Sequence, residues 1–105
     1  MRVQVNSGSG VDVDNELSRR VESTVSRILT RFEDQITRVE VHLSDVNSDK
    51  SGAQDKRCLM EARVAGLDPI AVTNLAANVE DAIKGAGEKL KTALENQFGR
   101  ARSRT

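Results

Sequence analysis

The chain has 105 residues, with 16 basic and 16 acidic side chains and a formal net charge of zero, so it can bury one hydrophobic core but not two. No stretch approaches the roughly 20 apolar residues of a membrane span, and the N-terminus alternates where a signal peptide would carry an apolar block. We therefore expect a single cytoplasmic domain with no membrane partner.

The first half of the chain predicts a strand, a helix and a second strand. Residues 2–6 alternate polar and apolar side chains, which is typical of a short strand with one apolar face. Apolar residues then recur at helical spacing and predict an amphipathic helix over residues 15–32, with Asp14 or Asn15 as its N-cap. Its apolar stripe is Leu17, Val21, Val25, Ile28, Leu29 and Phe32. Alternation returns over residues 36–45 and predicts a half-buried strand.

The second half predicts a hairpin, a further strand and a long helix. The polar residues 46–55 form a loop, and residues 56–65 alternate again. Residues 70–75 supply the last strand. The second helix starts at Asn78, with Asp81 three residues on as in a capping box. Its buried stripe is Val79, Ile83, Ala86, Leu90, Leu94 and Phe98.

This order, β-α-β-β-β-α, predicts an α+β fold with both helices packed on one face of a four-stranded mixed sheet. The first two strands, joined through a helix, should pair in parallel. Gly85 and Gly87 lie inside the second helix, where each costs about 1 kcal/mol relative to Ala, so we expect them to permit close packing. Residues 1–100 should form the domain, and residues 101–105 a disordered basic tail.

Charge is concentrated toward the C-terminus. Residues 84–105 hold six bases and two acids, which gives +4 and leaves −4 for the rest. The six bases are Lys84, Lys89, Lys91, Arg100, Arg102 and Arg104. Such an end can be an electrostatic footprint for phosphate or simply a solvated tail, and charge alone favours neither reading.

The predicted helices each carry a line of basic residues. Arg20, Arg27 and Arg31 lie within about 40° of one another in helical projection, and Lys84 and Lys91 are seven residues apart. Two such ridges could straddle RNA phosphates and release counterions on binding. Each side chain taken singly is better explained as cover for the apolar stripe, with Glu80 and Lys84 as a favourable i, i+4 pair.

Candidates for catalysis or metal binding are weak. His42 is the only histidine, and no Ser or Cys spacing suggests a triad around it. Cys58 is the only cysteine, cannot form an intrachain disulfide and is expected to be a small buried hydrophobe. The acids around residues 45–55 miss the calcium-loop spacing, and no Walker-type phosphate loop is present. We expect no enzyme, metal, cofactor or small-molecule substrate.

Two segments resemble the ribosome hibernation-promoting factor family, also called protein Y or sigma-54 modulation proteins. They are Phe32 with Ile36–Leu43, and the helix from Ala82 to Leu94. The chain departs from the family pattern at Asn78-Val79-Glu80, where an aromatic is missing, and at residues 92–96, where a basic run is replaced. The resemblance implies a fold akin to double-stranded-RNA-binding domains. It also implies docking on the small ribosomal subunit, in the mRNA and tRNA channel, to silence translation under stress.

Our leading hypothesis is therefore a ribosome-associated translation inhibitor that contacts rRNA phosphates through the nine basic residues named above. With the resemblance, the set of bases is better explained by RNA than by solvation. The alternative is a divergent protein-interaction module that self-associates, as a weak homodimer, through its open sheet face near Leu59. The family's long members carry a further dimerising domain, and the sequence stops at Thr105 after the second helix, so we expect short-form activity to be the closer analogy.

Overall fold

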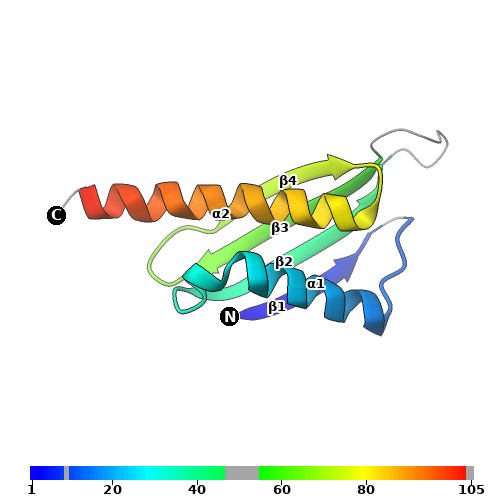
Figure 1. Cartoon of the computed structure of the whole chain (residues 1–105), viewed down its shortest axis with the longest axis horizontal. Helices are drawn as coiled ribbons and strands as arrows, with labels where there is room; N and C mark the ends of the chain where they lie inside the picture. The colour runs from blue at the N-terminus through cyan, green and yellow to red at the C-terminus, as the bar shows by residue number, and fades with distance from the viewer. Residues whose placement is uncertain (9, 47–54, 104–105) are drawn as a thin grey trace.

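A computed structural model describes residues 1–8, 10–46 and 55–103, with side chains described as far as Gly99. Four strands form one sheet, and two helices cover one of its faces (Figure 1). The elements are β1 (Arg2–Ser7), α1 (Asn15–Ile28), a 3₁₀ turn η1 (Thr30–Phe32), β2 (Ile36–Asp45), β3 (Lys56–Val64), β4 (Ile70–Ala76) and α2 (Val79–Ser103). The predicted β-α-β-β-β-α order and α+β class are confirmed.

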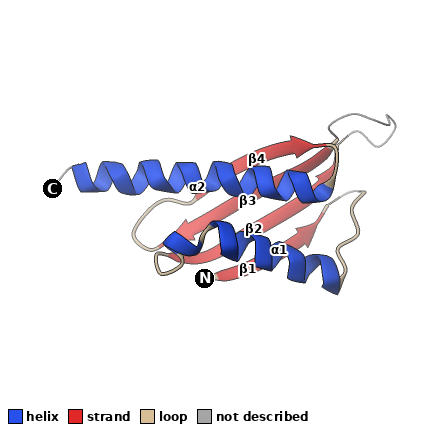
Figure 2. Ribbon diagram, viewed as in Figure 1, coloured by secondary structure: helices blue, strands red, loops and turns tan. Residues whose placement is uncertain are grey.

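The strands lie in the sheet in chain order, β1-β2-β3-β4 (Figure 2). β1 pairs with β2 in parallel, as predicted for strands joined through a helix, and the other two pairs are antiparallel. The predicted hairpin loop falls mainly on residues 47–54, which lie outside the described residues. At its base the Val46 amide donates to the Asp55 carbonyl over 2.9 Å, which holds the ends of β2 and β3 together.

The core lies between the sheet and the helices. Val39, Val41 and Leu43 of β2 are at most 1% exposed, and Cys58, Met60 and Ala62 of β3 are fully buried, on the faces that their alternation predicts. Leu90 and Leu94 of α2 are fully buried and complete the core on the helix side. Each fully buried Leu or Val stabilises the fold by about 1.5–3 kcal/mol, so the helices are held mainly by apolar packing. Phe32 and Phe98, the two aromatics, stack with centroids 5.4 Å apart.

The predicted first helix divides at Leu29. α1 ends at Ile28, and residues 30–32 form η1 instead of continuing the α-helix. The Thr30 hydroxyl donates to the carbonyls of Ser26 (2.6 Å) and Arg27 (3.2 Å). This side chain therefore satisfies acceptors at the end of α1 that the next helical amides would otherwise use.

The glycines of α2 do permit close approach. A Cβ on Gly85 would meet the side chain of Asn74 on β4, with only 2.6 Å to its Cγ, and a Cβ on Gly87 would lie 2.8 Å from Cδ1 of Ile28 on α1. Gly85 thus brings α2 down onto the sheet, and Gly87 brings α2 against α1. Both contacts agree with the packing role expected from the sequence.

The two ends of α2 can be compared with the predicted start and end of this helix. Asn78 accepts a hydrogen bond from the Asp81 amide (2.8 Å) and its side-chain amide donates to the Asp81 carboxylate (3.1 Å), so the predicted cap is present. At the other end α2 runs to Ser103, whereas we expected the structured domain to end at residue 100. No helix in the described part of the chain is long and apolar enough to span a membrane.

Candidate nucleic-acid interface

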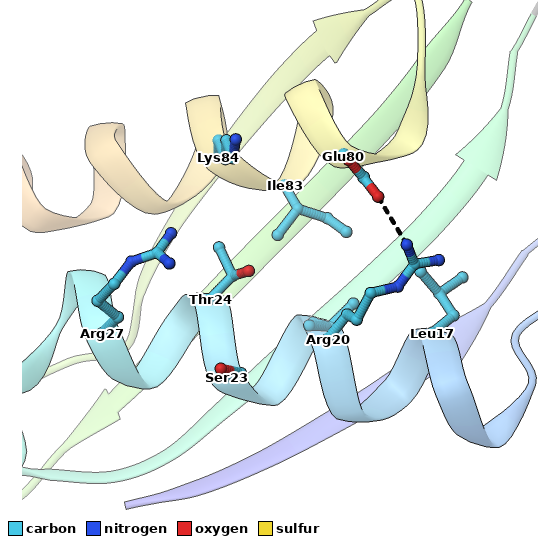
Figure 3. Close-up of a pocket in the computed structure, with 9 residues that line it drawn as sticks. Leu17, Arg20, Ser23, Thr24, Arg27, Glu80, Ile83 and Lys84 are labelled. Carbon is cyan, nitrogen blue, oxygen red and sulfur yellow. Dashed lines mark hydrogen bonds and ion pairs between the residues drawn. The ribbon is translucent and has the colours of Figure 1, made fainter.

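A groove runs between α1 and α2 on the side of the molecule away from the sheet. Its volume is about 250 Å³. Leu17, Val21 and Ile83 give it an apolar floor, and its rim carries Arg20, Arg27, Thr24, Glu80 and Lys84 (Figure 3). We call this feature the interhelical groove.

Local sequence places the rim residues. Arg20 and Arg27 are seven residues apart on α1, and Glu80 and Lys84 are four apart on α2, so each pair shares a helix face. The Asp14 side chain accepts from the Leu17 amide over 2.8 Å and fixes the start of α1. Because Gly87 lets α2 approach Ile28 closely, the two basic faces meet along one line.

An ion pair joins the helices at one end of the groove. Arg20 Nη1 lies 2.8 Å from Glu80 Oε1 (Figure 3). Both side chains are more than half exposed, at 56% and 61%, so the pair contributes about 0–1 kcal/mol to stability. The sequence paired Glu80 with Lys84 within one helix; in the structure the partner of Glu80 is Arg20 on the other helix, and this corrects the prediction.

A second ion pair joins η1 to α2 further along. Arg31 Nη1 lies 3.1 Å from Glu95 Oε2, and its guanidinium carbon lies 5.5 Å from the centroid of the Phe32 ring. The ring face attracts the cation and limits where the side chain can point. All three predicted ridge arginines therefore lie on the α2 side of the first helical segment, but two of them are already matched by carboxylates.

Arg27 and Lys84 lie between these two ion pairs along their helices. Neither side chain makes a hydrogen bond or ion pair within the part of the chain that the structure describes. In Figure 3 the Arg27 guanidinium points across the groove toward α2, where Lys84 lies. The uncompensated positive charge of the groove thus lies toward the end opposite the Arg20–Glu80 ion pair.

The remaining predicted bases are placed differently. The Lys89 ammonium donates to the Thr73 carbonyl on β4 over 3.0 Å, which is at the sheet edge and not in the groove. Lys91 is half-buried on α2. Arg100 and Arg102 belong to α2, but their side chains lie outside the description, as does all of Arg104. The structure brings Arg20, Arg27 and Lys84 into one site and leaves the role of the others a prediction.

Outside the groove, the candidate reactive residues of the sequence are Cys58 and His42. Burial raises the pKa of Cys58 to about 12, so its thiol is protonated at neutral pH, as expected of a buried hydrophobe. His42 is exposed on the open sheet face, and no cluster of three or more His, Cys, Asp or Glu among the described residues could hold a metal ion. On that face Arg38 and Arg63 are both paired with Glu40 (3.3 and 3.4 Å).

Sequence reasoning missed the acidic members of the site. Glu80 was paired within its own helix, and Glu95 entered only the charge balance and the replaced basic run at residues 92–96. The ion pairs span 60 and 64 residues of sequence, so no local spacing could indicate them. The available signal was weaker: each acid stands on the same helix face as the basic ridge that it helps to neutralise.

Comparison with known proteins gives a consistent result. Residues 4–102 match the family model described as "Sigma 54 modulation protein / S30EA ribosomal protein". The N-terminal domain of protein Y from Thermus thermophilus has a TM-score of 0.72 at 21% identity, over 91% of this chain and 98% of that one. A ribosomal subunit interface protein from Coxiella burnetii has a TM-score of 0.76 at 21% identity, over 94% and 99%.

No curated protein sequence matches the chain significantly. At 21% identity the two solved structures establish a shared fold. The family model carries the assignment, because it covers nearly the whole chain from β1 to the last turn of α2. The chain belongs to the sigma 54 modulation protein / S30EA ribosomal protein family, the hibernation-promoting factors that its sequence resembles.

Proposed function

We propose that this protein is a ribosome-associated translation inhibitor that docks on the small ribosomal subunit, in the channel of mRNA and tRNA. The interhelical groove contacts rRNA phosphates, and the protein blocks the channel sterically. Its work is then done in the cytoplasm and requires no catalytic step. Family membership supports the ribosome as partner, and Lys91, Arg100, Arg102 and Arg104 remain predicted RNA contacts beyond the groove.

The observation that carries this proposal is the pair Arg27 and Lys84. These two side chains, one from each helix and both without partners in the described structure, line the same open groove. A guanidinium presents a planar fork that fits phosphate oxygens, and an ammonium adds a second point charge. A phosphate between the helices would give both cations the partner that they lack.

The aromatic residues favour phosphate contact over base recognition. Proteins that read unpaired bases stack them on exposed aromatic rings. Phe32 is 4% exposed and its ring is stacked on Phe98, and the chain has no Trp or Tyr. Binding should therefore depend on RNA shape and charge and should vary little with RNA sequence.

Sedimentation with purified small subunits tests the proposal. The Arg27→Glu/Lys84→Glu variant should lose more than about tenfold in affinity, because both phosphate contacts become repulsive. The matched control is Arg2→Glu/Arg57→Glu, which makes the same charge change at two exposed positions of the open sheet face. The control should still sediment with the subunits. Equal loss in both variants, with both folded by circular dichroism, would refute a role for the groove.

A second candidate function rests on the open sheet face. Leu75 is 46% exposed and lies on this face near half-buried Leu59, one strand away. An apolar pair on a sheet surface favours contact with another protein. Light scattering that shows a concentration-dependent dimer, lost in Leu75→Lys, together with no sedimentation with ribosomes, would favour this self-associating module over the translation inhibitor.

A further inference from the structure

We propose that Glu80 and Glu95 are built-in competitors for phosphate, which hold Arg20 and Arg31 and thereby limit the strength with which the interhelical groove binds RNA. This inference rests on the proposed RNA-binding function of the groove. The proposed function concerns only the basic residues that contact RNA phosphates. This inference gives the two acids a role of their own, which is to set the affinity for RNA.

The geometry of the two ion pairs carries the inference. Each joins the first helical segment to α2, with Arg20 to Glu80 at 2.8 Å and Arg31 to Glu95 at 3.1 Å. They lie on either side of Arg27, along the same line of side chains. A carboxylate therefore occupies the guanidinium at each end of the basic line, where an RNA strand laid along the groove would place its phosphates.

In both ion pairs the carboxylate competes with phosphate for the arginine side chain and can be displaced by it. Carboxylate and phosphate both accept hydrogen bonds from the same guanidinium fork. Exposed ion pairs are weak, and these side chains are 38–61% exposed, so a phosphate can displace the acid. The displaced carboxylate then remains beside the phosphate and repels it. Each acid thus lowers the affinity for RNA in two ways: it pairs with the arginine in the free protein, and it repels the phosphate in the complex.

The charge balance gives the expected size of the effect. Arg20, Arg27, Arg31 and Lys84 are opposed by Glu80 and Glu95, which leaves two uncompensated cations of the four. When a protein binds a nucleic-acid duplex, each neutralised phosphate changes the slope of log affinity against log salt concentration by about 0.9. We use this value for duplex RNA. Releasing one arginine should steepen the slope by about that amount.

Glu80→Gln, Glu95→Gln and the double variant test the inference. Binding to an RNA duplex of about 16 base pairs is measured by fluorescence anisotropy between about 50 and 200 mM salt. Each single variant should bind about three- to tenfold more tightly at the low end, and its loss of affinity across the range should be about 3.5-fold larger than that of the native protein. The double variant should show both changes together.

The matched control is Glu22→Gln, which removes one negative charge from α1. Glu22 is exposed and lies two residues after Arg20, about 200° around the helix and away from the groove. Its substitution should change affinity by less than about twofold and should leave the salt slope unaltered.

The outcomes separate this inference from the proposed function. Equal changes in the Glu80, Glu95 and Glu22 variants, or weaker binding in the first two, overturn the inference. Binding by the double variant alone supports it, and no RNA binding by any variant overturns both proposals. If the salt slopes change as expected but neither the native protein nor the double variant sediments with small subunits, the inference stands and the ribosomal function fails.

Discussion

Asn74 is the residue through which β4 holds the start of α2. Its side-chain amide donates to the carbonyls of Asp81 (3.4 Å) and Ala82 (3.3 Å), and it fills the space where Gly85 has no side chain. The bonds are long, but the carboxamide faces the core side of the sheet, where an unsatisfied amide is costly. This contact explains why a glycine is kept inside a helix.

Gly85→Ala should destabilise the protein by about 1–3 kcal/mol, although Ala is the better helix former by about 1 kcal/mol. The new methyl group would displace Asn74 or lift α2 from the sheet. The control is Gly99→Ala on the same helix, where nothing lies within 4 Å of the new atom; that change should stabilise by up to about 1 kcal/mol. Thermal unfolding measures both, and a stabilised Gly85→Ala variant would contradict the packing role.

Cys58 should react slowly with thiol reagents in the folded protein. Its side chain is fully buried, and burial raises its pKa from 9.0 to about 12, so little thiolate forms at neutral pH. The neutral thiol is favoured in the fold, so stability from this group is complete below pH 9 and declines as the pH rises toward about 12. Labelling at pH 8 should be fast only in denaturant; fast labelling without denaturant would contradict the burial.

At the scale of elements, β4 is an edge strand with partial protection. The Thr73 carbonyl on this edge strand accepts a hydrogen bond from the Lys89 ammonium over 3.0 Å. A lysine on an exposed edge discourages pairing with another strand. Lys89 was predicted from the sequence to contact RNA, and this hydrogen bond turns its charge toward the sheet.

Lys89→Gln should therefore weaken RNA binding less than Lys84→Gln does. Both changes remove one charge from α2, but only Lys84 lines the interhelical groove. Anisotropy with the same RNA duplex should show a salt slope reduced by about 1 for Lys84→Gln and by clearly less for Lys89→Gln. A larger effect at Lys89 would place the RNA along β4 and α2 instead of between the helices.

The helices and strands were predictable because their signals are local. Alternation located β2 from 36 to 45, and the cap pattern located the start of α2 at Asn78. The break after Ile28 was missed, because it depends on the Thr30 hydroxyl reaching carbonyls of the preceding turn. Helical spacing alone does not distinguish a continued α-helix from a 3₁₀ turn with the same apolar stripe.

The candidate site was predictable only in part. Helical projection correctly put Arg20, Arg27 and Lys84 on exposed faces beside apolar stripes, and packing of those stripes makes the two faces meet. The partners of Glu80 and Glu95 depend on the relative position of two helices, which pattern reasoning does not supply. The same limit applies to Lys89, whose partner lies on a strand.

At the scale of the whole molecule, the two faces differ in how their unpaired cations are grouped. On the helical side Arg27 and Lys84, without partners among the described residues, line one groove. On the open sheet face Arg38 and Arg63 are bound by Glu40, and the exposed Arg2 and Arg57 lie on different strands, opposite Arg38 and Ser44 of β2. In a protein of zero net charge, this grouping favours the helical side as the one that meets phosphate. The account predicts that the helical side faces the ribosome.

Site-directed crosslinking to purified small subunits tests this claim most directly. Because Cys58 is buried, a photoreactive thiol reagent should label only an introduced cysteine. We would compare Ser23→Cys, which lines the groove, with Ala71→Cys, exposed on the open sheet face. The account predicts crosslinks to rRNA from Ser23→Cys and few or none from Ala71→Cys; crosslinks from Ala71→Cys alone would contradict it.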